Sequence, residues 1–147
     1  NYSVTAQSTF VAATFVFGAS DRLVSQRASG NDYAGTNAYI IGFVGSSTSL
    51  ASYIGGALRS AVTVSENQHI LYSSVHTGSA LTNKVNGTTG SVYSHTLNST
   101  YEHFDIGMTL GPEYWQGKIQ EVVMYTANRT SNRSNIEGNI NAHFSIY

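Results

Sequence analysis

Short segments rich in Val, Ile, Thr, Tyr and Phe recur through the first 125 residues, with clusters of Gly, Ser and Asn between them. β-Branched and aromatic side chains fit the pleated surface of a strand, whereas Gly, Asn and Ser favour turns. No segment in this part of the chain has the spacing of a long amphipathic helix. The pattern therefore predicts an all-β sandwich or barrel built from many short strands.

The chain has 147 residues, of which 41% are hydrophobic and 10% are charged. Such a chain can bury one sizeable core, but it is short for two ordinary domains. We therefore expect residues 1–147 to form a single domain. Because the sequence starts at Asn1 without a Met or a signal peptide, we also expect it to be part of a longer parent chain.

Two local patterns predict individual strands. The run from Phe10 to Phe17 is apolar or small on both faces, which indicates a central strand between two layers. Asn86 and Gly87 tolerate positive φ and lie between two strand-like runs, so a hairpin turn is predicted there. Further strands are predicted over residues 21–26, 37–44, 53–54, 57–64, 69–75, 83–85, 91–97 and 117–125.

Phe104, Ile106, Met108 and Leu110 alternate with less apolar residues. This alternation predicts a strand that buries one clean face. The same reasoning over the whole chain predicts a core that contains Phe15, Ile41, Leu71, Val75, Ile106, Met108, Ile119, Val123 and Ile140.

Helical periodicity occurs only at the end of the chain. Ile136, Ile140 and Phe144 fall on one helical face behind a polar run. Ser134 followed by Glu137 matches a capping box. We expect one short helix that closes the domain.

Three C-terminal segments carry a more specific signal: Gly117–Tyr125, Ser131–Glu137 and Asn139–Tyr147. They resemble the C-terminal signature of laminin-G-like domains of the kind found in bacteriophage structural proteins and bacterial surface proteins. The resemblance implies a concanavalin A-like fold, which is a two-sheet antiparallel jelly-roll sandwich, here with one short C-terminal helix. It also implies the binding of glycans or proteins without catalysis.

The charge balance argues against two classes of partner. Seven Lys and Arg residues stand against eight Asp and Glu residues, which gives a formal net charge of -1. A near-neutral chain lacks the basic surface that binds nucleic acid or anionic membranes. No apolar run approaches the roughly 20 residues of a membrane span. We expect neither nucleic-acid binding nor membrane insertion.

The polar residues are mostly neutral, with 35 Ser and Thr and 12 Asn in the chain. This differs from the Lys- and Glu-rich surface common in cytosolic domains, and we interpret it as an exterior surface. The chain has no Cys, which excludes disulfides and thiolate metal sites and favours a bacterial or viral source.

Glycoside hydrolases need two carboxylates beside the scissile bond. Glu102 and Asp105 are the closest acidic pair that could share a strand, and at this spacing they point to opposite faces. We therefore do not expect an enzyme.

Glu121 shares the strand parity of Ile119, Val123 and Tyr125, which predicts a half-buried carboxylate. We interpret Glu121 as a structural residue that accepts hydrogen bonds and fixes a strand. The alternative is a general acid with a raised pKa.

No cofactor is expected, although the resemblance leaves calcium open, because related sandwiches bind it at an edge through oxygen ligands. Asp21, Asn31 and Asp32 are the candidate ligands. The chain has only three Asp residues, so the alternative is that Asp21 caps a turn and that Asn31 and Asp32 shape a loop.

Tyr33, Tyr53, Tyr114 and Trp115 lie in or beside predicted loops and are the candidate ligand-binding residues. Flat aromatic rings stack on the C–H faces of sugars, and they also anchor protein interfaces. Trp115 is an equal candidate for simple packing in the core.

The hypothesis that combines these observations is a non-catalytic module on a virion surface. It would be a bacteriophage decoration or fibre domain that attaches to other virion or surface proteins and contacts host glycans. We expect a homo-oligomer, namely a trimer or another closed ring, because neutral surfaces pack together without desolvating charges. The alternatives are a secreted or cell-surface bacterial carbohydrate-binding module, and a glycan-acting enzyme domain.

Overall fold

The computed structural model describes residues 2–16, 22–28, 38–43, 48–108 and 113–147. The strands are β1 (Tyr2–Val4), β2 (Gln7–Phe15), β3 (Arg22–Arg27), β4 (Ala38–Gly42), β5 (Ser49–Ile54), β6 (Ala57–Thr63), β7 (His69–His76), β8 (Ala80–Val85), β9 (Thr88–Thr89), β10 (Tyr93–Ser94), β11 (Ser99–Tyr101), β12 (His103–Ile106) and β13 (Gly117–Tyr125). A 3-10 turn, η1 (Thr130–Asn132), leads into the helix α1 (Arg133–Phe144).

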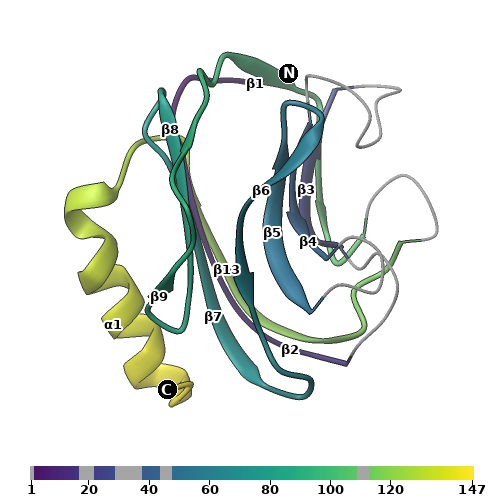
Figure 1. The fold of residues 1–147 in the computed structure, drawn as a ribbon, viewed down its shortest axis with the longest axis vertical. Helices are drawn as coiled ribbons and strands as arrows, with labels where there is room; N and C mark the ends of the chain where they lie inside the picture. Colours follow the sequence, from purple (N-terminus) through teal and green to yellow (C-terminus); the bar gives the residue numbers. More distant parts are fainter. Residues whose placement is uncertain (1, 17–21, 29–37, 44–47, 109–112) are drawn as a thin grey trace.

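The strands form two layers, with α1 on the outer side of one of them (Figure 1). The back sheet, next to α1, has the order β10-β8-β7-β2-β13, with β9 beside β8. The front sheet has the order β12-β3-β4-β5-β6, and β1 pairs separately with β11. All these pairings are antiparallel. The predicted fold class, an antiparallel jelly-roll sandwich with a short C-terminal helix, is therefore confirmed.

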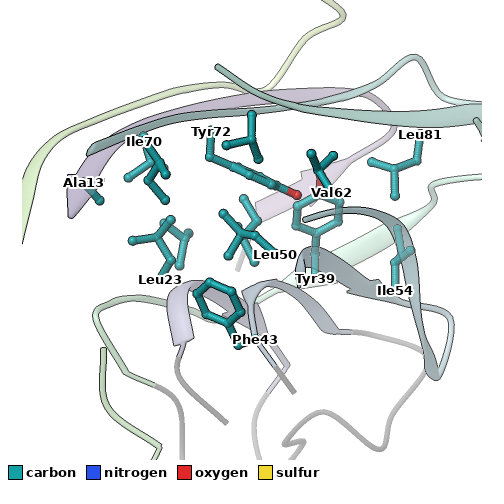
Figure 2. Packing of buried hydrophobic residues seen from close by; sticks show 14 of the residues in the cluster. Ala13, Leu23, Tyr39, Phe43, Leu50, Ile54, Val62, Ile70, Tyr72 and Leu81 are labelled. Carbon is teal, nitrogen blue, oxygen red and sulfur yellow. The ribbon is translucent and has the colours of Figure 1, made fainter. Parts of the chain in front are cut away.

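Two apolar clusters stabilise the layers. The larger cluster lies between the sheets, where Leu23 and Leu50 of the front sheet, and Phe43 directly after β4, pack against the back sheet (Figure 2). The smaller cluster lies beneath α1 and includes Phe10 of β2 and Ile140 of the helix. The central strand β2 is thus buried on both faces, as its sequence predicted.

Four of the predicted core residues are confirmed as buried: Ile41, Leu71, Val75 and Ile140. Ile119 and Val123 are half-buried in the edge strand β13. The side chain of Phe15 lies outside the described structure.

The prediction of a buried face from Phe104 to Leu110 is wrong. Phe104, Ile106 and Met108 are 37%, 50% and 39% exposed, and Leu110 lies outside the described residues. β12 is an edge strand that pairs with β3, so these side chains lie at the margin of the sandwich. Alternation along a strand shows which side chains share a face, but it does not show whether another layer covers that face.

A β-bulge divides the side chains of β13 between the two clusters. The register with β2 shifts between Ile119 and Glu121, and an extra residue in one strand moves the following side chains to the other face. Ile119 packs against the inner cluster, whereas Val123 and Tyr125 pack beneath α1. The prediction that Glu121 shares a face with Ile119 is therefore wrong, while its shared face with Val123 and Tyr125 is confirmed.

The predicted helix and hairpin are both present. Asn86 and Gly87 connect β8 to β9 with φ values of 47° and 78°, as a tight hairpin turn requires. The predicted capping box is wrong, because Asn132 is the N-cap of α1 and no side chain caps this end. Among the described residues, no helix is long and apolar enough to cross a membrane.

Two histidines meet where β7 approaches the segment after β10. His76 is buried, and its Nδ1 accepts a hydrogen bond from the Gly78 N–H at 3.1 Å. Because Nδ1 accepts, the hydrogen of the neutral His76 ring is on Nε2. This Nε2 lies 3.3 Å from Nδ1 of His95 and donates to it. Burial, together with the nearby His95, lowers the pKa of His76 to about 4. Burial and the charge of Arg59 also lower the pKa of His95.

We expect the free energy of unfolding to fall as the pH decreases from about 6.5 to about 4. An unfolded His titrates near pH 6.5, whereas folded His76 titrates near pH 4. In this window the unfolded state binds the proton first, so acid favours unfolding, and above about pH 6.5 the contribution vanishes. Urea unfolding at a series of pH values measures this dependence.

Two variants isolate the contribution of His76. His76→Asn should lose less stability across this window than the wild type, because Asn retains an acceptor for Gly78 but does not titrate. His69→Asn, at the exposed start of β7, should follow the wild type. Parallel curves for His76→Asn and the wild type would contradict the assignment.

Candidate functional site

A groove of about 460 Å³ lies between β13 and α1 on the outer side of the back sheet. This helix groove has a volume within the range of ordinary small-ligand sites. The side chains that β13 contributes are those after its bulge: Glu121, Val123 and Tyr125. The side chains from the end of η1 and from α1 are Asn132, Asn135, Ile136, Asn139, Ile140 and His143.

The helical part of the groove carries a polar stripe: Asn132, Asn135, Asn139 and His143. These residues are spaced by three or four positions, which places them along one side of the helix. All four are exposed. Ile136 and Ile140 lie beside them and pack toward the sheet. The groove therefore combines an apolar floor with a wall of amide groups.

A buried ion pair positions α1 against the sheet. Arg133 Nε lies 2.8 Å from Glu137 Oε1, and the two side chains are 7% and 8% exposed. Arg133 Nη2 donates to the backbone carbonyl of Ser73 in β7 at 2.8 Å, and Nη1 donates to that of Thr82 in β8 at 3.2 Å. The hydroxyl of Ser73 completes the cluster, since it accepts from Arg133 Nη2 at 2.6 Å and donates to Glu137. These contacts tie the helix to the backbone of β7 and β8 and so position one wall of the groove.

The four predicted ligand-binding aromatics do not line this groove. Trp115 is 8% exposed and stacks on Phe43, with ring centroids 5.8 Å apart. Its Nε1 donates to the carbonyl of Thr14 at 3.1 Å. Trp115 therefore packs in the core, which is one of the two roles that the sequence left open.

Tyr53 and Tyr114 lie far apart. Tyr114 is 58% exposed and sits opposite Met108, next to the edge of the front sheet. Tyr53 is half-buried in β5, and β3 and β4 lie between β5 and the edge strand β12. Three strand spacings separate β5 from β12, a distance of about 14 Å. The structure does not bring these rings into one platform, and Tyr33 lies outside the described residues.

The candidate calcium ligands Asp21, Asn31 and Asp32 also lie outside the described residues. Within the part of the chain that is described, no three His, Asp or Glu side chains converge as metal ligands do. Glu121 is half-buried on the wall of the helix groove. Among the candidate site residues named from the sequence, Glu121 is the one in the described part of the chain that lines this groove.

The amide stripe could have been found in the sequence. Asn132, Asn135 and Asn139 flank the apolar positions Ile136 and Ile140 at helical spacing. The sequence does not reveal that β13 lies across from this stripe, because the facing residues come from a strand whose bulge determines their side.

The groove can exchange many neutral hydrogen bonds with a ligand. Each side-chain amide offers two donors and one acceptor group, and Glu121 adds acceptors. Tyr125, Ile136 and Ile140 supply apolar surface. This chemistry suits a ligand that carries hydroxyl groups on an apolar framework.

Comparison with solved structures identifies the fold. The chain is similar to a heptameric SAP-like pentraxin from Limulus polyphemus, with a TM-score of 0.69, 12% identity, and coverage of 89% of this chain and 68% of the pentraxin. It is similar to domain 4 of an extracellular GH43 arabinanase from Geobacillus stearothermophilus in complex with arabinotriose, with a TM-score of 0.70, 14% identity, and coverage of 92% and 68%. It is also similar to Trypanosoma rangeli sialidase, with a TM-score of 0.65, 15% identity, and coverage of 86% of this chain but 21% of the sialidase.

These neighbours have concanavalin A-like, jelly-roll sandwich domains, in agreement with the fold that the sequence predicted. They include a sialidase and a domain of an arabinanase as well as a pentraxin, so the shared fold does not define an activity. No protein-family model matches the sequence, and no curated protein matches it.

We expect Arg133→Met to destabilise the fold by about 3–5 kcal/mol, because it leaves the Glu137 carboxylate buried without its partner. The double variant Arg133→Met/Glu137→Met removes both charges and should lose less stability than the single variant. Urea unfolding of the wild type, both single variants and the double variant measures the coupling. If the double variant loses as much unfolding free energy as the two single variants together, the pair does not anchor α1.

Proposed function

We propose that this domain is a non-catalytic carbohydrate-binding module that binds a saccharide in the helix groove. The observation that carries the proposal is the stripe of Asn132, Asn135 and Asn139 facing Glu121 and Tyr125 across an apolar floor. Sugar hydroxyls need both donors and acceptors, which amides provide together. The C–H faces of a sugar ring pack on aromatic and aliphatic side chains.

The arrangement of carboxylates supports binding without hydrolysis. Glu121 is the only carboxylate among the described residues that line the groove. Glycoside hydrolysis by the usual route needs a second carboxyl group across the scissile bond. Glu137, the next acidic residue along the chain, lies in α1 and is buried in the ion pair with Arg133.

The comparisons add support of a general kind. Domain 4 of the arabinanase has the same fold and was solved with arabinotriose bound. The sialidase shows that this fold also occurs within enzymes. The proposal for this chain therefore rests on its groove rather than on its neighbours.

We expect the isolated domain to bind oligosaccharides on a glycan array and to leave them intact. Asn135→Ala/Asn139→Ala should weaken binding about tenfold or more, because two hydrogen-bonding groups are lost. Both side chains are exposed, so the fold should be retained. Asn98→Ala, an exposed amide between β10 and β11, is the matched control and should bind like the wild type. Titration calorimetry with the best array ligand measures the affinities.

Two outcomes would contradict this proposal. Loss of binding in Tyr53→Ala or Tyr114→Ala, with no change in the double Asn variant, would place the site at that tyrosine instead. Release of shortened saccharides would show an enzyme.

We further propose, following the laminin-G-like resemblance, that this module is mounted on an exterior surface, with a bacteriophage virion as the first candidate. The neutral hydroxyl and amide composition supports packing against other proteins without desolvating charges. The pentraxin neighbour, which shares this fold, is heptameric, which is consistent with an oligomer. A secreted or cell-surface bacterial module is the alternative.

We expect the purified domain to form a trimer or another closed ring. Its mass in solution, measured by light scattering, tests the assembly, and electron microscopy of the native source tests the location. A stable monomer obtained from a source without virus particles would favour the secreted module.

A further inference from the structure

A second cavity of about 270 Å³ continues the helix groove at the end nearest η1. Tyr125, Asn132 and Ile136 line both spaces, and Arg129 lines only the smaller one. The guanidinium carbon of Arg129 lies 4.7 Å from the centroid of the Tyr125 ring. The groove therefore has a cation at one end, held against its aromatic floor.

The side chain of Arg129 has no polar partner in the described part of the chain. Its Nε is buried and makes no hydrogen bond. Arg22, Arg27 and Arg133, by contrast, each form an ion pair with a carboxylate. Arg59 also has a buried Nε without a hydrogen bond, but it does not line the groove. A buried polar group without a partner is uncommon in native proteins and calls for an explanation, such as an ion or ligand.

The backbone holds Arg129 in place without using its guanidinium. The N–H of Arg129 donates to the hydroxyl of Ser8 at 3.0 Å, and the same hydroxyl donates to the carbonyl of Ala127 at 3.0 Å. The hydroxyl of Thr130 and its N–H both bond to the side chain of Asn128. The position of Arg129 is thus fixed by the chain around it, while its charged group remains available.

We propose that this end of the groove binds the acidic group of an anionic saccharide. A guanidinium offers a planar fork of donors that fits a carboxylate or a sulfate with two hydrogen bonds. Asn132 lies in the same cavity and adds an amide donor. The inference rests on the proposed saccharide binding and adds the class of sugar.

The distribution of charge also gives the ligand an orientation. Glu121 lines the larger part of the groove and Arg129 the smaller part. A second acidic sugar beside Glu121 would be repelled, whereas a neutral sugar there can use the amides of Asn135 and Asn139. The favoured ligand has its acidic residue at Arg129 and neutral residues toward His143. With a formal net charge of -1, the chain as a whole does not attract anions, so the selection is local.

The test uses an array of uronate-containing, sialylated and sulfated oligosaccharides, each printed beside its carboxyl-methylated or desulfated form. The wild type should prefer the acidic member of a pair by about tenfold or more, since hydrogen bonds to charged groups are the stronger ones. Arg129→Gln should lose this preference, because its affinity for the acidic form falls much more than its affinity for the neutral form. Arg129→Lys, which keeps the charge without the fork, should retain part of the preference. The carboxylate and sulfate pairs identify which acidic group is recognised.

Arg59→Gln is the matched control. Arg59 also lies over a tyrosine, 4.2 Å from the Tyr93 centroid, and its Nε is likewise buried without a hydrogen bond. It is not among the residues that line either part of the groove. Arg59→Gln removes the same charge from the protein and should keep the preference of the wild type. Thermal unfolding of all variants shows whether the fold is retained.

Equal binding of acidic and neutral forms by the wild type would overturn the inference, as would an equal loss of both forms in Arg129→Gln. A wild type that binds no saccharide at all would refute the proposed function. Titration with acetate and with inorganic sulfate, followed by the NMR signal of the Arg129 Nε–H, then separates the failure of the proposed function from the failure of this inference. A saturable shift would leave an anion site without a saccharide function, and no shift would refute both.

Discussion

The back sheet is apolar on both faces at its centre, and the rest of the structure depends on covering both of them. Phe10, Val11, Ala12 and Ala13 are consecutive in β2, and all four are fully buried. In a strand, consecutive side chains point in opposite directions. One layer can cover only one of these faces, so the front sheet covers the inner face and α1 covers the outer one (Figure 1).

The helix α1 is held against the back sheet by an ion pair as well as by apolar contacts. The Arg133–Glu137 pair lies between α1 and the sheet and reaches the backbone of β7 and β8. Burying two charges is costly unless both are paired and hydrogen-bonded. Here the ion pair, the Ser73 hydroxyl and two backbone carbonyls satisfy that condition. Because the cluster has a defined geometry, it positions the helix more exactly than apolar packing alone would.

The helix groove is a consequence of where this helix stops covering the sheet. α1 lies over β7 and β2, and β13 is the edge strand next to β2. The bulge between Ile119 and Glu121 turns Glu121, Val123 and Tyr125 toward the side of the sheet that carries the helix. The polar side of the helix then faces Glu121 and Tyr125 across a space that packing leaves open. A shared sandwich fold does not dictate such a site, since it depends on one bulge and on one helix position.

Local sequence patterns determined the fold class, the Asn86–Gly87 turn, the C-terminal helix and much of the core, because each depends on neighbouring residues and on periodicity. The exposure of Ile106 and Met108, the burial of Trp115 and the face of Ile119 were decided only in the tertiary structure. These properties depend on whether a second layer extends over a strand and on where a bulge interrupts its alternation. The same distinction between sequence pattern and tertiary contact applies to the candidate site. The spacing of Asn132, Asn135 and Asn139 is written in the sequence, but their position opposite Glu121, and that of Arg129 over Tyr125, arises from contacts between separate elements.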